Sequence, residues 1–157
     1  MARRARTDDE LRAVSEHLHY EVSMFLTLTR AMATGVFGTS AINNALLEAF
    51  TVHARVLLDF LFSEARYEDD VVAGNFLAGQ DWPTIRGTVS PILDAVRKRV
   101  GKEVAHLTYA RVTVTPDAKQ WRFLDIAKDM ESLVRCFVAA VPKSRLGPSW
   151  HPAEEGG

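Results

Sequence analysis

The sequence predicts an all-α fold, a four-helix bundle with a long connection between its second and third helices. Apolar residues recur at steps of three and four residues over four stretches, near 9–33, 41–62, 90–112 and 116–141. This spacing places them on one face of a helix, where they can pack against a common core. Residues that cap helix N-termini precede these stretches, so we expect four helices and no sheet.

Length and composition limit the class of protein. A chain of 157 residues fits one domain, expected over residues 9–141 between a flexible start at 1–8 and a disordered tail at 142–157. Lys and Arg number 19 against 20 Asp and Glu, so the net charge of -1 gives no overall attraction for nucleic acid or acidic lipid. Cys136, the only cysteine, excludes a disulfide framework and a cysteine-based zinc cluster. No apolar run approaches the roughly 18 residues of a membrane span, so we expect a cytoplasmic protein with no membrane contact.

The sequence predicts the N-terminal caps and the buried faces of the first two helices. Thr7 or Asp8 can cap the first helix, Gly35 and Gly38 can end it, and Ser40 can cap the second. The stripe expected to face inward on the first helix is Leu11, Val14, Leu18, Val22, Phe25, Leu28 and Met32. On the second helix it is Ile42, Leu46, Ala49, Phe50, Val56, Leu57, Phe60 and Leu61.

His53 lies at the centre of the apolar face of the second helix. Two interpretations are open. It is either a neutral core histidine with a hydrogen bond to a neighbouring helix, or a side chain that reaches a site between helices.

Residues 63–89 form the long connection, with three glycines, one proline and the acidic cluster Glu68, Asp69 and Asp70. Connections of this length usually contain short helices, so we expect a helical turn near residues 70–76 and Trp82 packed onto the bundle. The Asp69 and Asp70 pair is either a solvated cluster at a helix start or a site for a metal ion or a basic partner.

The third and fourth helices repeat one start signal, a capping hydroxyl followed by proline: Ser90 with Pro91, and Thr115 with Pro116. The inward stripe expected of the fourth helix is Phe123, Ile126, Ala127, Met130, Leu133, Val134, Phe137 and Val141, and Pro142 should end it.

On the third helix, Arg99 and His106 are seven residues apart, about 20° short of two turns, so they point the same way. Glu103 lies between them, near the edge of the apolar stripe, where it can orient His106 or form an ion pair with Arg99.

The segment R-V-G-K-E-V-A-H, from Arg99 to His106, resembles the R-x(4-6)-H motif of the HEPN superfamily (higher eukaryotes and prokaryotes nucleotide-binding). These are small all-helical proteins, often homodimeric, and many are metal-independent endoribonucleases of toxin-antitoxin, phage-defence and RNA-processing systems. The resemblance implies a HEPN-like fold, Arg99 and His106 as catalytic residues, and a homodimer that brings two third-helix flanks together. It implies no cofactor.

This pair suits phosphodiester cleavage. An imidazole that titrates near neutrality can move the proton of a 2'-hydroxyl, while a guanidinium holds the phosphate. Glu103 and His53 are supporting candidates, and Arg97 and Lys102 are candidates for RNA contact. The alternative is a catalytically inactive HEPN-like homodimer that acts as an interaction or regulatory module, for example with a cognate antitoxin. A solvated basic face with a plain Arg99–Glu103 surface pair is equally open.

Two E-x-x-H pairs, Glu16 with His19 and Glu103 with His106, raise the question of a metal site, because helical bundles can hold metal ions through such motifs. Relative to the apolar stripe of the first helix, Glu16 points away from the core and His19 lies over a quarter turn off. Glu48 on the second helix also faces outward. We therefore expect no metal.

Overall fold

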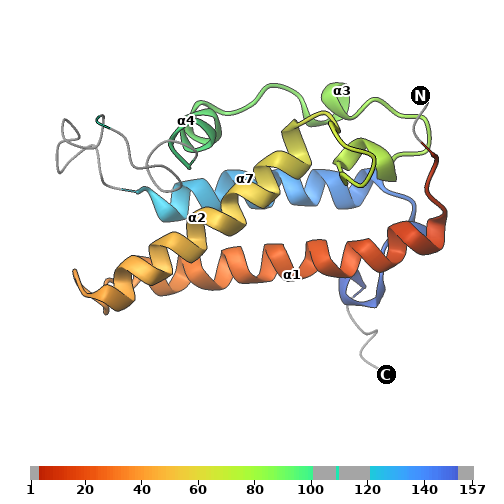
Figure 1. Cartoon of the computed structure of the whole chain (residues 1–157). Coiled ribbons are helices and arrows are strands. Elements are labelled where there is room, and N and C mark those ends of the chain that lie inside the picture. Colours follow the sequence, from red (N-terminus) through yellow and green to blue (C-terminus); the bar gives the residue numbers. More distant parts are fainter. Residues whose placement is uncertain (1–3, 101–108, 110–120, 152–157) are drawn as a thin grey trace.

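A computed structural model describes residues 4–100, 109 and 121–151, and these residues form helices and turns with no strand among them. The α-helices in this part are α1 (Asp8–Ala33), α2 (Ala41–Phe62), α3 (Trp82–Arg86), α4 (Pro91–Arg99) and α7 (Phe123–Ala140). Three short 3-10 helices accompany them: η1 (Ala73–Phe76), η3 (Lys143–Arg145) and η4 (Pro148–Trp150). The all-α prediction is confirmed for the described residues, which contain three long helices, α1, α2 and α7, rather than four (Figure 1).

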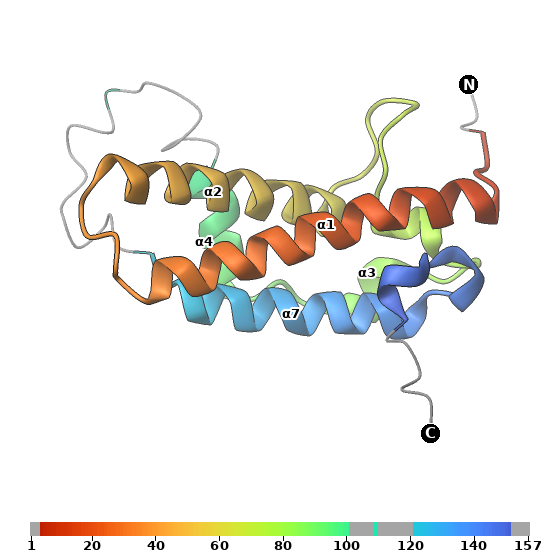
Figure 2. The ribbon, with the colours of Figure 1, turned by 90° about the horizontal axis from the view of Figure 1, so that it is seen from below.

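α1 and α2 form an antiparallel pair along most of their length (Figure 2). Thr7 and Glu10 close a capping box at the start of α1, since the Thr7 hydroxyl accepts a hydrogen bond from the Glu10 N–H and the Glu10 carboxylate accepts one from the Thr7 N–H. The turn between the helices uses Gly35 and Gly38, whose φ angles of 65° and 54° favour glycine. Ser40 caps α2, as predicted.

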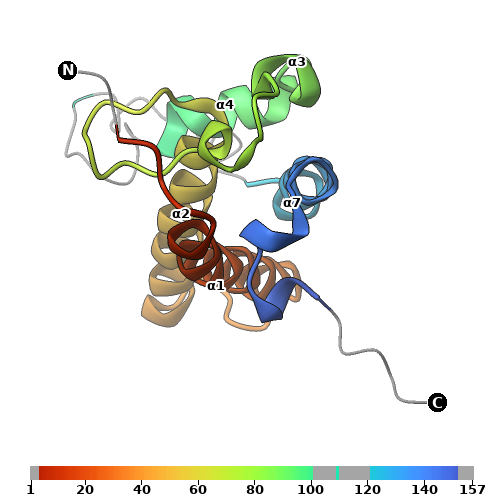
Figure 3. The same ribbon diagram turned by 90° about the vertical axis from the view of Figure 1, so that its right-hand side faces the viewer.

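α7 packs against α1 from the other side, and α3 and α4 lie over α7 and α2 (Figure 3). Phe137 of α7 is buried where these elements meet. Its ring lies edge-on to the rings of Phe60, Phe76 and Trp82, with centroids 5.1, 5.5 and 5.8 Å apart. This arrangement is the favoured one for aromatic pairs, and it joins α2, η1, α3 and α7.

The connection at residues 63–89 has the two predicted features. A helical turn, η1, occupies residues 73–76, and Trp82 is buried against the bundle. The Trp82 indole N–H donates to the backbone carbonyl of Leu61 at 2.7 Å, which satisfies one of the free carbonyls at the end of α2.

The third predicted helix starts where expected and is shorter than expected in the described part. Ser90 caps α4 through the Leu93 N–H, and Pro91 is its first residue. α4 ends at Arg99, and the described residue Tyr109 lies in a turn, so an unbroken helix to residue 112 is wrong.

The fourth predicted helix begins later than expected. The predicted start at Thr115 and Pro116 lies outside the described residues, but Trp121 and Arg122 are described and are not helical. The ψ of 66° at Arg122 is not helical, and α7 begins at Phe123. The predicted inward stripe still holds, because Ile126, Met130 and other members of that list are buried.

Ile42 and Val56 were predicted to face inward on α2, and the structure corrects this. Their side chains are 59% and 41% exposed. α2 is apolar around most of its circumference, so its pattern does not define a single buried side. No helix in the described part is both long and apolar enough to span a membrane.

The C-terminal segment (residues 142–151) was predicted to be disordered, and the structure shows it folded along α1. Leu146 is 4% exposed. The Gly147 N–H donates to the Ser15 hydroxyl at 2.7 Å, and the Trp150 indole N–H donates to the Ser15 carbonyl at 2.8 Å. These contacts are made by 3-10 turns and by polar groups, which a search for apolar periodicity cannot detect.

Two carboxylates of α1 bind this segment. Asp8 accepts hydrogen bonds from the Ser144 hydroxyl and the Arg145 guanidinium, both at 2.8 Å, and these bonds, Ser144 first, lower the pKa of Asp8. Glu16 accepts hydrogen bonds from the hydroxyl and the N–H of Ser149, which lower the pKa of Glu16.

Candidate functional site

The last turn of α4 presents the basic residues singled out by the sequence. Burial of Leu93 and Val96 fixes the rotation of the helix. Arg97 and Lys98 are therefore exposed, and Arg99 is half-buried at the edge of the core. Three cations at this end of a helix are favourable because the backbone dipole places partial negative charge there.

Arg99 lies over the ring of Trp121, with its guanidinium carbon 4.1 Å from the ring centroid. Trp121 is itself held by Phe50 of α2, whose ring meets it edge-on with centroids 6.0 Å apart. The indole face attracts the cation and restricts its side-chain rotation. Arg99 is thus an ordered arginine at the edge of the bundle.

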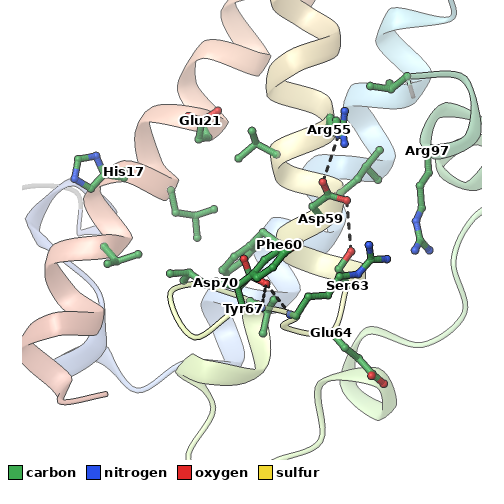
Figure 4. Close-up of a pocket in the computed structure, with 18 residues that line it drawn as sticks. His17, Glu21, Arg55, Asp59, Phe60, Ser63, Glu64, Tyr67, Asp70 and Arg97 are labelled. Atoms are coloured by element: carbon green, nitrogen blue, oxygen red, sulfur yellow. Dashed lines mark hydrogen bonds and ion pairs between the residues drawn. The ribbon is translucent and has the colours of Figure 1, made fainter. Parts of the chain in front are cut away.

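Arg97 and Arg99 lie on different sides of α4. The two residues are about 200° apart around the helix axis. Arg97 lines a cleft of about 690 Å³ bounded by α1, α2, α4 and the start of the 63–89 connection. Figure 4 shows Arg97 extending from α4 beside this cleft, across from Arg55 and Asp59 of α2.

The cleft has apolar walls and a charged rim. Leu18, Leu58 and Phe60 supply buried apolar surface. Its remaining lining includes His17, Glu21, Arg55, Asp59, Ser63, Glu64, Arg66, Tyr67, Asp70 and Arg97 (Figure 4). With carboxylates and guanidinium groups both present, the rim does not select strongly for one sign of charge.

Several of the rim charges already have partners. The Arg55 Nε lies 3.6 Å from the Asp59 carboxylate, and the Ser63 hydroxyl donates to the same carboxylate at 3.4 Å. Among the described residues, no hydrogen bond or ion pair involves the Arg97 guanidinium.

Asp70 has a structural role in the connection. Its carboxylate accepts hydrogen bonds from the backbone N–H groups of Arg66 and Tyr67 at 2.6 and 2.8 Å, which closes the turn before η1. Asp69 is exposed. No group of three metal-ligating side chains occurs in the described part of the chain.

His53 forms a hydrogen bond to a neighbouring helix, which is the contact that the core-histidine interpretation predicts. Its Nδ1 lies 2.6 Å from the carboxylate of Glu21 on α1, and its side chain is 13% exposed. The ring also meets that of Tyr20 edge-on. Glu21 lines the cleft, so this pair lies at the cleft's α1 wall.

The structure therefore places Arg97 and the His53–Glu21 pair at one cleft, on its α4 and α1 sides, and Arg99 on a different surface, against Trp121. Lys102, Glu103 and His106 lie outside the described residues, so their position relative to Arg99 stays a prediction.

The E-x-x-H pair on α1 has other partners than a metal ion. Glu16 binds Ser149, and His19 meets the Trp150 ring edge-on with centroids 5.2 Å apart. Glu16 points away from the core, as predicted, but the C-terminal segment covers it. Glu48 of α2 is exposed.

The chain matches no known family model, curated protein or solved structure.

Two contributors to this region were missed by sequence reasoning. Trp121 was assigned to the fourth helix, whereas the structure places it before α7, and no local pattern predicts its contact with Arg99. Glu21 has a weaker signal: it is a carboxylate on the half-buried side of α1, and His53 needs a partner there.

Proposed function

We propose that this chain is a HEPN-like, metal-independent endoribonuclease in which Arg99 holds the scissile phosphate and His106 transfers the proton. The observation that carries the proposal is the stacking of the Arg99 guanidinium on Trp121 at 4.1 Å. A phosphate-binding arginine is most effective when it is ordered before the substrate arrives.

The chemistry needs only the RNA and these side chains. His106 accepts the proton of a 2'-hydroxyl, whose oxygen attacks the adjacent phosphorus. The bond from phosphorus to the 5'-oxygen breaks, which leaves a 2',3'-cyclic phosphate, and the 5'-oxygen takes up the proton that His106 accepted. Arg99 stabilises the negative charge that builds up on the phosphate oxygens.

The basic last turn of α4 supports an RNA ligand. Lys98 is exposed about 100° from Arg99 around the helix axis and can bind a neighbouring phosphate, while Arg97, about 200° from Arg99, can contact RNA only further along the strand. Because the net charge of the chain is only -1, the attraction for RNA phosphates is local to this turn. Its charges are exposed and are screened by salt, so RNA binding should weaken as salt is added.

The test is incubation of the purified protein with mixed RNA, with and without excess chelator. Cleavage should persist in chelator and should stop when the 2'-hydroxyl at the scissile position is removed. His106→Ala should abolish cleavage. Arg99→Ala should reduce it by about 100-fold, whereas Arg135→Ala, an exposed arginine of α7, should leave it unchanged.

Trp121→Leu tests the observation itself. Leucine retains apolar bulk but not the cation-binding ring face, so activity should fall while RNA binding through Arg97 and Lys98 persists. Intact RNA under every condition would reject cleavage. The alternative that would then stand is a catalytically inactive HEPN-like interaction module with a partner protein.

A further inference from the structure

The outward side of α2 carries a second apolar stripe. Its members, from the first turn of the helix to the last but one, alternate in steps of three and four residues: Ile42, Ala45, Ala49, Val52 and Val56. This outer stripe of α2 has the heptad spacing of a helix that packs lengthwise against another helix.

The outer stripe is largely exposed. Ile42, Val52 and Val56 are 59%, 56% and 41% exposed, Ala45 is exposed and Ala49 is half-buried. Tyr20 of α1, 55% exposed, extends the apolar surface beside it through its contact with His53. In Figures 1 and 3, one side of α2 has no other labelled helix over it.

We propose that the outer stripe of α2 packs antiparallel against the outer stripe of a second copy of this chain, and that this α2 pair, rather than the third helix, is the main contact of a homodimer. An antiparallel pair centred between Phe50 and Thr51 sets Ala49 against the partner's Val52. It also sets Ala45 against the partner's Val56. Each small residue then faces a larger one, which lets the two helices approach closely.

The charges beside the stripe specify a second copy as the occupant. Glu48 and Arg55 are exposed on the same edge of α2, seven residues and therefore about 10 Å apart. In the antiparallel arrangement Glu48 faces Arg55 of the partner subunit, and the symmetry repeats this pair at the other end. A parallel arrangement would put the two charged edges on opposite sides of the interface, where they could not pair.

The interface also borders the cleft. Val56 belongs both to the outer stripe and to the cleft lining, so the N-terminal half of the partner's α2 would form an additional wall there. None of the interface residues is Arg99 or His106. The mass of the protein in solution and its action on RNA are therefore independent measurements.

The first experiment measures mass by sedimentation equilibrium of the full chain from nanomolar to high micromolar concentration. We expect a dimer of twice 17.5 kDa at micromolar concentration. Val52→Glu should raise the dissociation constant by at least about 100-fold. Leu124→Glu is the matched control, because Leu124 is 64% exposed on α7 and is not part of the outer stripe of α2. Circular dichroism establishes that both variants stay helical.

Charge reversal then tests the antiparallel register. Glu48→Arg alone and Arg55→Glu alone should each weaken the dimer by about tenfold, because each places like charges opposite one another twice. The double variant should restore the wild-type dissociation constant. A wild-type monomer at every concentration, or a double variant no tighter than the single ones, would overturn the proposal.

Discussion

Ser15→Ala should weaken the attachment of the C-terminal segment to α1 while leaving α1 itself intact. Ser15 is fully buried, and its hydroxyl donates to the Arg12 carbonyl and accepts from the Gly147 N–H, both at 2.7 Å. Alanine removes the acceptor and leaves the buried Gly147 N–H without a partner, at a cost of about 1–3 kcal/mol. At about 2–4 °C per kcal/mol for a chain of this size, the melting temperature should fall by about 2–12 °C.

The assay combines thermal melting with hydrogen exchange at the Gly147 amide. Exchange should accelerate in Ser15→Ala, because that amide is protected by a single hydrogen bond to the hydroxyl. Ser23→Ala on the same helix is the control, since its hydroxyl makes only a 3.5 Å contact with His19. A melting temperature equal to that of the wild type, with unchanged exchange at Gly147, would refute this account of the segment.

Three further predictions concern packing and pH. Phe137→Ala should lower the free energy of unfolding by about 3–5 kcal/mol in urea titrations, because the ring is buried among three aromatic neighbours. Stability should decrease as pH falls below about 4.5, because the pKa values of Asp8 and Glu16 are lowered on folding and their bonds are lost on protonation; Glu16→Gln should flatten that decrease. Gly147→Ala should return the pKa of Glu16 towards its ordinary value in an NMR titration, because an added Cβ would overlap the Glu16 carboxylate and displace it from Ser149.

Helix starts were the most predictable part of this fold. The caps at Thr7, Ser40 and Ser90 depend on a side chain and a backbone N–H a few residues away, so a short stretch of sequence contains all that determines them. The start of α7 has no such cap, since Arg122 makes no capping hydrogen bond through its side chain, and Trp121 before it packs on Phe50 of α2. That contact joins residues far apart in the sequence, and no local pattern reports it.

In the candidate site too, local geometry could be predicted from the sequence and tertiary contacts could not. The 100° rotation per residue shows without a structure that Arg97 and Arg99 leave α4 on different sides. What each side meets depends on tertiary packing: a cleft against α1 and α2 for Arg97, and an aromatic ring for Arg99. Ile42 and Val56 were misassigned because burial on a helix that is apolar on both sides is decided by its neighbours.

The bond between Ser15 and Gly147 has a consequence for synthesis of the chain. The two residues are 132 positions apart, so at about 5–20 residues per second a ribosome adds Gly147 roughly 7–26 s after Ser15. During that interval α1 can form and pair with α2, but its Ser15 face has no cover. Contacts with so large a sequence separation are also the slowest to close. The nascent chain therefore completes this side of α1 last, and the face around Ser15 is where an unfinished chain is open to chaperones or to other chains.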